Sequence, residues 1–352
     1  MFAVCLTFVK RLPYTKRSSI VVFFDAIGHN SKNAAFMPSP FVLIDHSSYL
    51  EHDTGGGLHP EVPGRVAAIR QRLTQGRLAT LMTIHPPKSI ARADLLSVHD
   101  ESYLFRLEEA CLVGQTSIDH SDNQICYESF DVALLSAAGG MTAIDLLESG
   151  HAGKVFCAVR PPGHHAERST ALGFCFLNNV AIAARYWQKV YQRKKIFIVD
   201  WDAHHGNGIQ SAFESDPDVF YASIHEHPTF SFPGTGYAEE HGVGSGYGAI
   251  LNVPLPPGAD DEMLLDAIWA KIYPAFETFQ PEALIVAAGF DGHRDDDMSG
   301  LAYSTNVYEK LGLTMKQWGQ RCQGRVVSIL EGGYHLEALA ASVEAYLVGL
   351  TG

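Results

Sequence analysis

Short apolar runs recur along the chain, and segments with helical spacing of apolar residues lie between them. The runs are continuous rather than alternating, which is typical of strands that are buried on both faces of a parallel sheet. Regular alternation of such strands with helices predicts an α/β fold. The expected strands are residues 41–44, 79–84, 155–159, 196–199, 219–224, 249–253, 283–288 and 325–330.

Five segments between these runs have the apolar spacing of helices. The clearest covers residues 129–150, where Ser129 is a candidate N-cap and Gly150 a candidate stop. Neither an internal repeat nor a linker-like change of composition follows residue 40, so we expect one domain there. The other expected helices are residues 63–76, 173–191, 261–279 and 305–322.

The composition narrows the classes of function. A formal net charge of −13 at pH 7 argues against a protein that binds nucleic acid through phosphate contacts. The negative charge mildly favours a cationic substrate, although acidic surfaces also serve solubility. Six scattered cysteines without a CxxC pair are typical of a reduced, cytoplasmic compartment. No apolar run reaches the length of a membrane span, so we expect no membrane partner.

The first residues do not fit the pattern of the rest. Two short apolar pieces within residues 1–24 are separated by lysines and arginines, and this order differs from that of a signal peptide. Met37 opens a stretch that reads like a natural beginning. We therefore expect residues 1–36 to be an atypical N-terminal extension and residues 37–352 to form a single domain.

Polar clusters follow four of the expected strands directly. The run 155–159 leads to RPPGHH, 196–199 to DWDAHHGNG, 283–288 to GFDGH and 325–330 to EGGY. In open parallel sheets, ligands bind outside the carboxyl ends of the strands. We therefore expect the four clusters to converge on one crevice.

The cluster after residue 199 has the composition of a metal site. Asp200, Asp202 and His204 lie two residues apart, so an extended strand would place them on one face. Carboxylate and imidazole groups suit zinc and similar divalent metals, and a catalytic zinc keeps an open position beside about three protein ligands. Asp291 follows another apolar run and is a further candidate ligand. Capping of the next helix is the alternative role for an Asp after a strand.

Three more residues are candidates for acid–base and oxyanion chemistry. His164 and His165 are adjacent in a tight turn after Pro-Pro-Gly, where both could line a pocket. Tyr334 follows two glycines, which let the backbone approach a site closely, and a phenol can donate a hydrogen bond to a developing oxyanion. A lone His or a single GGY is weak evidence by itself. The acidic run 295–297 is typical of a solvated loop.

Taken in order, the motifs RPPGHHA, VDWDAHHGNG, FPGTG, AGFDGH and LEGGY resemble those of the zinc-dependent histone deacetylase family and its acetylpolyamine amidohydrolase relatives. The segment 50–65 resembles the N-terminal part of that family, and the likeness covers roughly residues 41–350. The resemblance implies a three-layer arginase/deacetylase-type α/β fold. A single, mostly parallel sheet of about eight strands would lie between helices, and residues 37–352 would be the deacetylase catalytic domain.

The resemblance also implies roles for residues of the central motifs. Zinc would be the catalytic metal, and a structural potassium ion would lie nearby. The positions that match zinc ligands are Asp202, His204 and Asp291. The positions that match catalytic residues are the tandem histidines His164 and His165 and the transition-state tyrosine, Tyr334. Asp200 would hydrogen-bond His164 and, together with Ser223, bind potassium.

Other matching positions belong to the substrate tunnel and to the support of the histidines. The positions that match the acyl-lysine tunnel are Gly173, Phe174, Phe232 and Met298. Asp122 matches a rim aspartate that holds the substrate backbone, and Asn207 would orient His165. Class I members carry Asp at the position of Asn207, whereas class II members and bacterial relatives carry Asn, so the chain resembles class II. A neutral Asn stabilises a charged His165 less than a carboxylate would.

The resemblance leaves alternatives for the reaction. We expect hydrolysis of acetyl or other short acyl groups from acyl-lysine side chains, and an apolar Met298 suits such a chain. An acetylpolyamine deacetylase with the same mechanism is the alternative. An arginase-like dimanganese hydrolase would need a second Asp close to Asp291, where Gly292 and His293 follow. A catalytically inactive acyl-chain binder would normally have lost a metal ligand, a catalytic histidine or the tyrosine. The sequence does not decide whether the chain forms a homo-oligomer.

Overall fold

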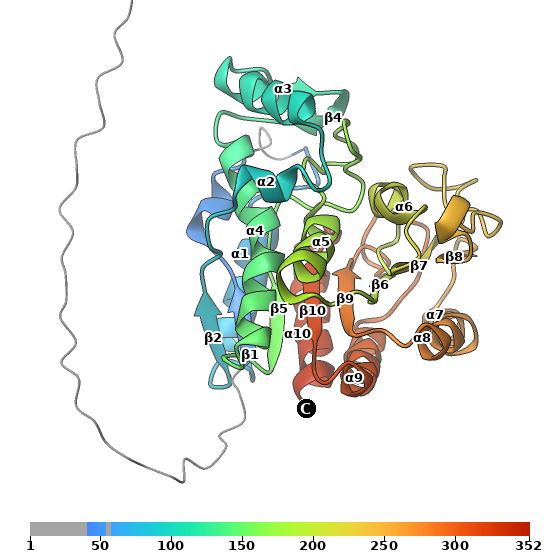
Figure 1. Cartoon of the computed structure of the whole chain (residues 1–352). Helices are drawn as coiled ribbons and strands as arrows, with labels where there is room; N and C mark the ends of the chain where they lie inside the picture. Colours follow the sequence, from blue (N-terminus) through green and yellow to red (C-terminus); the bar gives the residue numbers. More distant parts are fainter. Residues whose placement is uncertain (1–40, 54–57) are drawn as a thin grey trace, which may run out of the picture. The chain divides into compact units, whose positions relative to one another are not determined.

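The structure, a computed structural model, describes residues 41–53 and 58–352, so the expected extension and its boundary lie outside the described residues. Eight parallel strands of the described chain form one sheet in the order β2-β1-β5-β10-β9-β6-β7-β8 (Figure 1). This arrangement confirms the expected α/β fold. The strands are β1 (Phe41–Ile44), β2 (Met82–His85), β5 (Lys154–Cys157), β6 (Ile196–Asp200), β7 (Val219–Glu226), β8 (Ile250–Leu255), β9 (Ala283–Ala288) and β10 (Val326–Leu330), and β3 (Ser117–Ile118) and β4 (His120–Gln124) form a separate antiparallel pair.

Helices fill most of the connections between the strands. Short 3-10 segments lie at Ser47–Leu50 and Gly244–Gly246, and a π-helical stretch, Ile268–Ile272, joins α7 to α8. The helices are α1 (Gly64–Gln75), α2 (Arg92–Leu95), α3 (Glu101–Leu112), α4 (Ser129–Glu148), α5 (Asn179–Tyr191), α6 (Asn207–Phe213), α7 (Asp261–Ala267), α8 (Tyr273–Phe279), α9 (Thr305–Arg321) and α10 (Leu336–Thr351).

These helices cover both faces of the sheet, as continuously apolar strands require. Two consecutive residues of β10 show the two sides. Ser328 hydrogen-bonds Tyr346 of α10 (Oγ–OH 2.7 Å), whereas Ile329 lies beside Gly140 of α4. Since neighbouring strand residues point to opposite faces, α4 and α10 lie on opposite sides of the sheet. α5 packs beside α4, and α1 and α9 pack beside α10 (Figure 1).

Several expected elements have different ends in the structure. The strand expected at 79–84 begins only at Met82 and is an exposed edge strand rather than a buried one. The helix expected from residue 173 begins at Asn179, because Gly173 and Phe174 have φ angles of 54° and 67°, which an α-helix does not allow. Helices α3 and α10 were not expected. α10 is apolar and buried on most sides, so its sequence lacks the polar stripe that marks an amphipathic helix.

One helix of the described residues, α4, is long and apolar enough to cross a membrane, with a mean hydropathy of 1.5 over its most apolar 18 residues. The expectation that no apolar run reaches this length is therefore wrong. Of this 18-residue stretch, 67% is buried inside the protein. A core helix between a sheet and its neighbours passes the same test of length and composition.

Candidate active site

Four neighbouring strands bring the polar clusters together. β5, β10, β9 and β6 lie side by side in the sheet, and each ends immediately before one of the clusters. Because these strands are parallel, their carboxyl ends share one edge of the sheet. The expected convergence on one crevice is present in the structure.

Asp202, His204 and Asp291 form one buried group at this edge. Their potential ligand atoms all lie within 4.8 Å of one another. His204 Nδ1 lies 3.2 Å from Asp202 Oδ1 and 3.0 Å from Asp291 Oδ2. Backbone N–H groups hold both carboxylates in place, since Gly332 N donates to Asp202 (2.7 Å) and Ala203 N to Asp291 (2.9 Å).

The donor set of this group fits a divalent cation. His204 Nε2 lies 3.1 Å from the carbonyl oxygen of Met298, which only accepts, so Nε2 carries the proton of a neutral ring and Nδ1 faces the two carboxylates with its lone pair. The group therefore needs a positive charge, either a metal ion or a second proton on the ring. Burial would lower the pKa of His204, but Asp202 and Asp291 raise it well above its usual value. Burial and the nearby Asp202 raise the pKa of Asp291 to about 7.

The extended strand assumed over residues 200–204 is wrong beyond Asp200, where β6 ends. The chain turns there, and each carboxylate accepts the N–H group two residues further on. Asp202 N donates to Asp200 and His204 N donates to Asp202, both at 3.0 Å. The turn divides the candidates, because Asp200 meets His164 while Asp202 and His204 join Asp291.

The tandem histidines lie in different surroundings. His164 Nδ1 is 3.2 Å from Asp200 Oδ2, and its Nε2 is 3.8 Å from Asp202 Oδ1. Burial would lower the pKa of His164, but Asp202 and Asp200 raise it to about 10. His165 Nδ1 instead meets the amide oxygen of Asn207 at 2.8 Å. Burial and the neighbouring histidines hold the pKa of His165 well below its usual value.

Two glycines allow Tyr334 to reach the same site. A side chain at Gly332 would lie 2.2 Å from Asp291 Oδ2 and 2.5 Å from Asp202 Oδ2, so the backbone approaches the carboxylates only as glycine. Gly333 has a φ of 121°, a conformation that other residues rarely adopt. Burial raises the pKa of the Tyr334 hydroxyl well above its usual value, so this group stays a hydrogen-bond donor.

A cavity of about 220 Å³ leads to these groups and contains every expected tunnel residue in its lining. Gly173 is a close-contact position here, because a side chain on it would lie 2.4 Å from the ring of His165. The expected rim residue, Asp122, also lines the cavity. The lining residues are Asp122, His165, Gly173, Phe174, His204, Phe232, Met298 and Tyr334.

Comparison with known proteins identifies the family. A model described as the histone deacetylase domain matches residues 59–350 of the chain. The chain belongs to the histone deacetylase family. Among solved structures, the crystal structure of the HDA15 HD domain is similar, with a TM-score of 0.83 and 32% identity over 89% of this chain and 88% of that one.

Relatives of this histone deacetylase family chain include proteins of plants, archaea and bacteria. Histone deacetylase 14, chloroplastic, of Arabidopsis thaliana is 37% identical over 81% of this chain and 71% of its own length. A probable deacetylase of Archaeoglobus fulgidus is 36% identical, over 84% and 81% of the two chains. The histone deacetylase-like amidohydrolase of Pseudomonas aeruginosa is 32% identical, over 78% and 72%.

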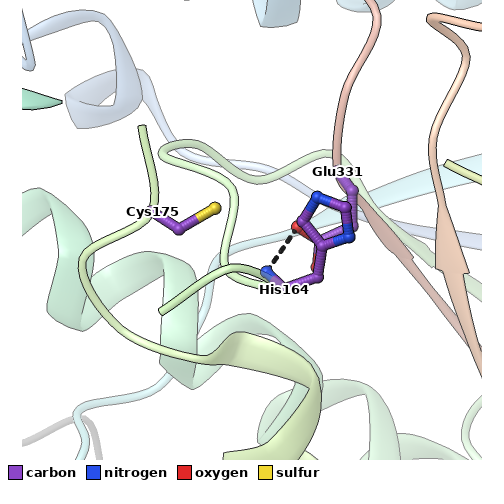
Figure 2. A group of neighbouring side chains, drawn as sticks. All are labelled: His164, Cys175 and Glu331. Carbon is purple, nitrogen blue, oxygen red and sulfur yellow. Dashed lines mark hydrogen bonds between the residues drawn. The ribbon is translucent and has the colours of Figure 1, made fainter. Parts of the chain in front are cut away.

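In this histone deacetylase family chain, Glu331 holds the loop of the tandem histidines in place. The sequence had given Glu331 no role. Figure 2 shows Glu331 beside His164, with Cys175 on a separate loop. Glu331 Oε2 accepts the N–H groups of Gly163 (2.7 Å) and His164 (3.0 Å), and burial raises the pKa of Glu331 to about 7. The carboxylate thereby ties the histidine loop to the loop that leads to Tyr334. Its position directly after an apolar run could have identified it, as it did Asp291.

The expectation that the acidic run 295–297 is a solvated loop is wrong for Asp296. Its side chain is buried, at 5% exposure, whereas its two neighbours in the run are exposed. Asp296 Oδ2 accepts the N–H groups of Tyr334 and the next residue (2.6 and 2.9 Å), and Oδ1 accepts that of Met298 (3.2 Å). One carboxylate thus fixes both the tyrosine and a tunnel wall. Nothing in the local sequence distinguishes Asp296 from the other two acids.

Proposed function

We propose that this chain is a zinc-dependent amidohydrolase that removes acetyl or other short acyl groups from acyl-lysine side chains. Family membership and the names of the relatives support deacetylase activity. The observation that carries the proposal is the cavity with Phe174 and Phe232 in its walls that ends at His204, a member of the buried acidic group. His165 and Tyr334 line the same cavity.

Asp202, His204 and Asp291 would hold the zinc ion. Two carboxylates and one imidazole make three protein ligands, which leaves the open position that a catalytic zinc requires. When bound, zinc would polarise the amide carbonyl and lower the pKa of a water molecule. The carbonyl of Met298 would keep His204 in the tautomer with Nδ1 free for the metal.

His165 is suited to accept the proton of the attacking water. It lines the cavity, and its lowered pKa keeps it neutral near pH 7, so that it has a free nitrogen to accept a proton. Asn207 Nδ2 donates to Glu167 (2.8 Å), so the amide oxygen of Asn207 faces His165 and leaves the proton of a neutral ring on Nδ1. Nε2 is then the free acceptor, and it would return the proton to the leaving amine. His164, held as a cation by carboxylates, would contribute a nearby positive charge.

Tyr334 would donate a hydrogen bond to the oxyanion that forms on the substrate carbonyl. Its hydroxyl keeps its proton because burial raises its pKa, and its ring lines the cavity. A donor placed where negative charge develops stabilises the transition state more than the ground state. The products would be acetate and a free amine.

The tunnel walls favour an aliphatic side chain. Phe174, Phe232 and Met298 are apolar and would pack along the methylene groups of an acyl-lysine. An acetylpolyamine has a similar acetamide end but carries further positive charges, and an acetylpolyamine deacetylase with the same residues in the same roles is the second candidate. The net charge of −13 on the protein is compatible with such a cationic substrate.

Asp200 and Ser223 would bind a structural potassium ion. They are register partners on the adjacent strands β6 and β7, and both are buried. Oxygen ligands from a carboxylate and a hydroxyl suit such a hard cation. Potassium titration of the thermal midpoint of the zinc-loaded protein tests this site, and no difference from sodium would contradict it.

Side-by-side rates on acetyl-lysine peptides and acetylpolyamines test the proposed function. We expect zinc-loaded protein to release acetate from the peptides, with kcat/KM at least about tenfold above that for the polyamines. Chelation should abolish the rate, and added zinc should restore it. Faster hydrolysis of polyamines would favour the second candidate. No acetate from either class, or two manganese ions per chain, would overturn the proposal.

A further inference from the structure

Four aromatic side chains gather on the loop after β7, which also forms part of the cavity wall. We call His227, Phe230, Phe232 and Tyr237 the mouth patch. The ring of His227 meets those of Phe230 and Tyr237 edge-on, at centroid distances of 6.1 and 5.7 Å. Phe230, Phe232 and Tyr237 are 67%, 42% and 39% exposed. Large aromatic surface therefore faces solvent on this loop.

Phe232 belongs both to the mouth patch and to the wall of the cavity. The ring of Phe232 lies edge-on to His165 at 5.0 Å and lines the cavity, yet it also reaches the surface. Phe230 precedes it by two residues. A lysine whose acylated side chain fills the cavity leaves its backbone at the mouth, so the residues next to that lysine must lie on the surrounding surface.

Side-chain hydrogen bonds hold the backbone of this loop. Glu240 Oε1 accepts the N–H groups of Gly236 and Tyr237, both at 2.9 Å. The carbonyl of Gly236 accepts from His225 Nε2 (2.8 Å), and His205 Nδ1 lies 2.9 Å from the hydroxyl of the threonine before Gly236. His205 thus supports the loop rather than the acidic group. A surface fixed in this way loses less conformational freedom when a ligand binds.

Folding alone does not account for the exposure of these rings. Contiguous exposed aromatic groups are typical of binding surfaces, and tyrosine is enriched among residues that dominate binding energy. On the cavity lining, the carboxylate of Asp122 could accept backbone N–H groups of an extended peptide. A free polyamine has neither backbone amides nor side chains to place on these two features.

We infer that the mouth patch binds an apolar or aromatic side chain adjacent to the acyl-lysine of a peptide or protein substrate. The inference rests on the proposed function and narrows its substrate class from any acyl-lysine to acyl-lysines of polypeptides that have a hydrophobic residue beside the lysine. The patch lies beside the reacting groups without including them. It should therefore govern KM for flanked substrates and leave the chemical step unchanged.

A peptide series tests the inference on the zinc-loaded full chain. The peptides carry acetyl-lysine flanked on either side by Phe, Leu, Gly or Glu, and acetyl-lysine amide without neighbours is the minimal substrate. We expect kcat/KM to be at least about fivefold higher for Phe or Leu than for Gly flanks, mainly through KM. Phe230→Ser and Tyr237→Ser should remove most of this preference while keeping the rate on the minimal substrate.

Tyr247→Ser is the matched control. Tyr247 is 72% exposed, but it lines a groove with Lys195 and Phe220, near the amino ends of β6 and β7 and thus away from the cavity. This variant should keep both the preference and the rate. Equal rates for all flanks in the unmodified chain would overturn the inference. So would an equal loss on the minimal substrate in Phe230→Ser and Tyr237→Ser, because the patch would then support the tunnel itself.

Failure of the proposed function can be told apart from failure of this inference. If no substrate is hydrolysed, the proposed function fails, and fluorescence anisotropy with the same labelled peptides still reports binding. A Kd that falls with hydrophobic flanks and rises in Phe230→Ser supports the patch, whereas a flank-independent Kd overturns it. Dimerisation that Phe230→Ser abolishes, seen by light scattering, would also overturn it, since a second copy would then occupy the patch.

Discussion

The two tandem histidines are adjacent in sequence, yet one lies among carboxylates and the other beside a neutral amide. His164 contacts Asp200 and Asp202, and its backbone N–H group is held by Glu331. His165 meets only the oxygen of Asn207 through Nδ1 and turns its ring toward the cavity. The pKa of His164 is raised to about 10, whereas that of His165 is well below its usual value.

We propose that this difference gives two identical side chains distinct tasks. A histidine that stays charged supplies a fixed positive charge, whereas a neutral one can accept a proton. Environment rather than residue type would then determine which group acts as the base, as in other active sites where paired groups have separated pKa values. Substitutions at five residues can break or sharpen the contrast.

The largest effect is expected at Asp202, which belongs to the proposed metal-ligand group and also lies close to His164. Asp202→Ala removes one proposed ligand and leaves two, so we expect loss of zinc and a fall in kcat of at least about a thousandfold. Metal content by mass spectrometry and turnover on an acetyl-lysine peptide measure both. Asp297→Ala, at an exposed position, is the control. Retention of one zinc ion per chain in Asp202→Ala would refute the ligand role.

A smaller effect is expected from each histidine, and their ranking tests the contrast directly. His165→Ala removes the proposed base, so kcat should fall about a hundredfold or more, the usual range for general acid–base catalysis. His164→Ala removes only a nearby charge and should cost about tenfold. Both variants should keep their zinc. If His164→Ala were the more damaging, the assignment of the base to His165 would be wrong.

Much of this site follows from the sequence, and the remainder depends on packing. Asp200, Asp202, His204 and Asp291 could be named as candidates because acids and imidazoles that follow apolar strands are costly unless they are used, whereas the choice of Asp202, His204 and Asp291 among them came from the family resemblance. The turn after Asp200 could not be predicted, since it depends on carboxylates accepting N–H groups two residues on. Asp296 was also beyond local sequence, because its burial comes from the loop of Tyr334, which is distant in the chain.

Two substitutions of Glu331 distinguish the effect of its negative charge on His164 from the effect of its hydrogen bonds on the position of His164. Glu331→Gln keeps an oxygen for the N–H groups of Gly163 and His164 but removes a negative charge, so we expect only a several-fold fall in kcat. Glu331→Ala removes the acceptor as well and should lower kcat further, together with the melting temperature. Steady-state rates and thermal melts compare the two. Equal loss in both variants would show that charge rather than position matters.

The smallest effect on the rate above the acidic limb, with only a shift of the pH profile, is expected from making the surroundings of His165 resemble those of His164. Asn207→Asp places a carboxylate beside Nδ1 and raises the pKa of His165. Because the base must be neutral, the acidic limb of kcat/KM should move to higher pH by about one unit, so the rate falls up to about tenfold below the limb and is unchanged above it. Asn306→Asp, an added carboxylate at an exposed position on α9, should leave the profile in place. An unmoved limb in Asn207→Asp would mean that His165 is not the group whose protonation limits the rate, and the contrast between the two histidines would then lose its functional meaning.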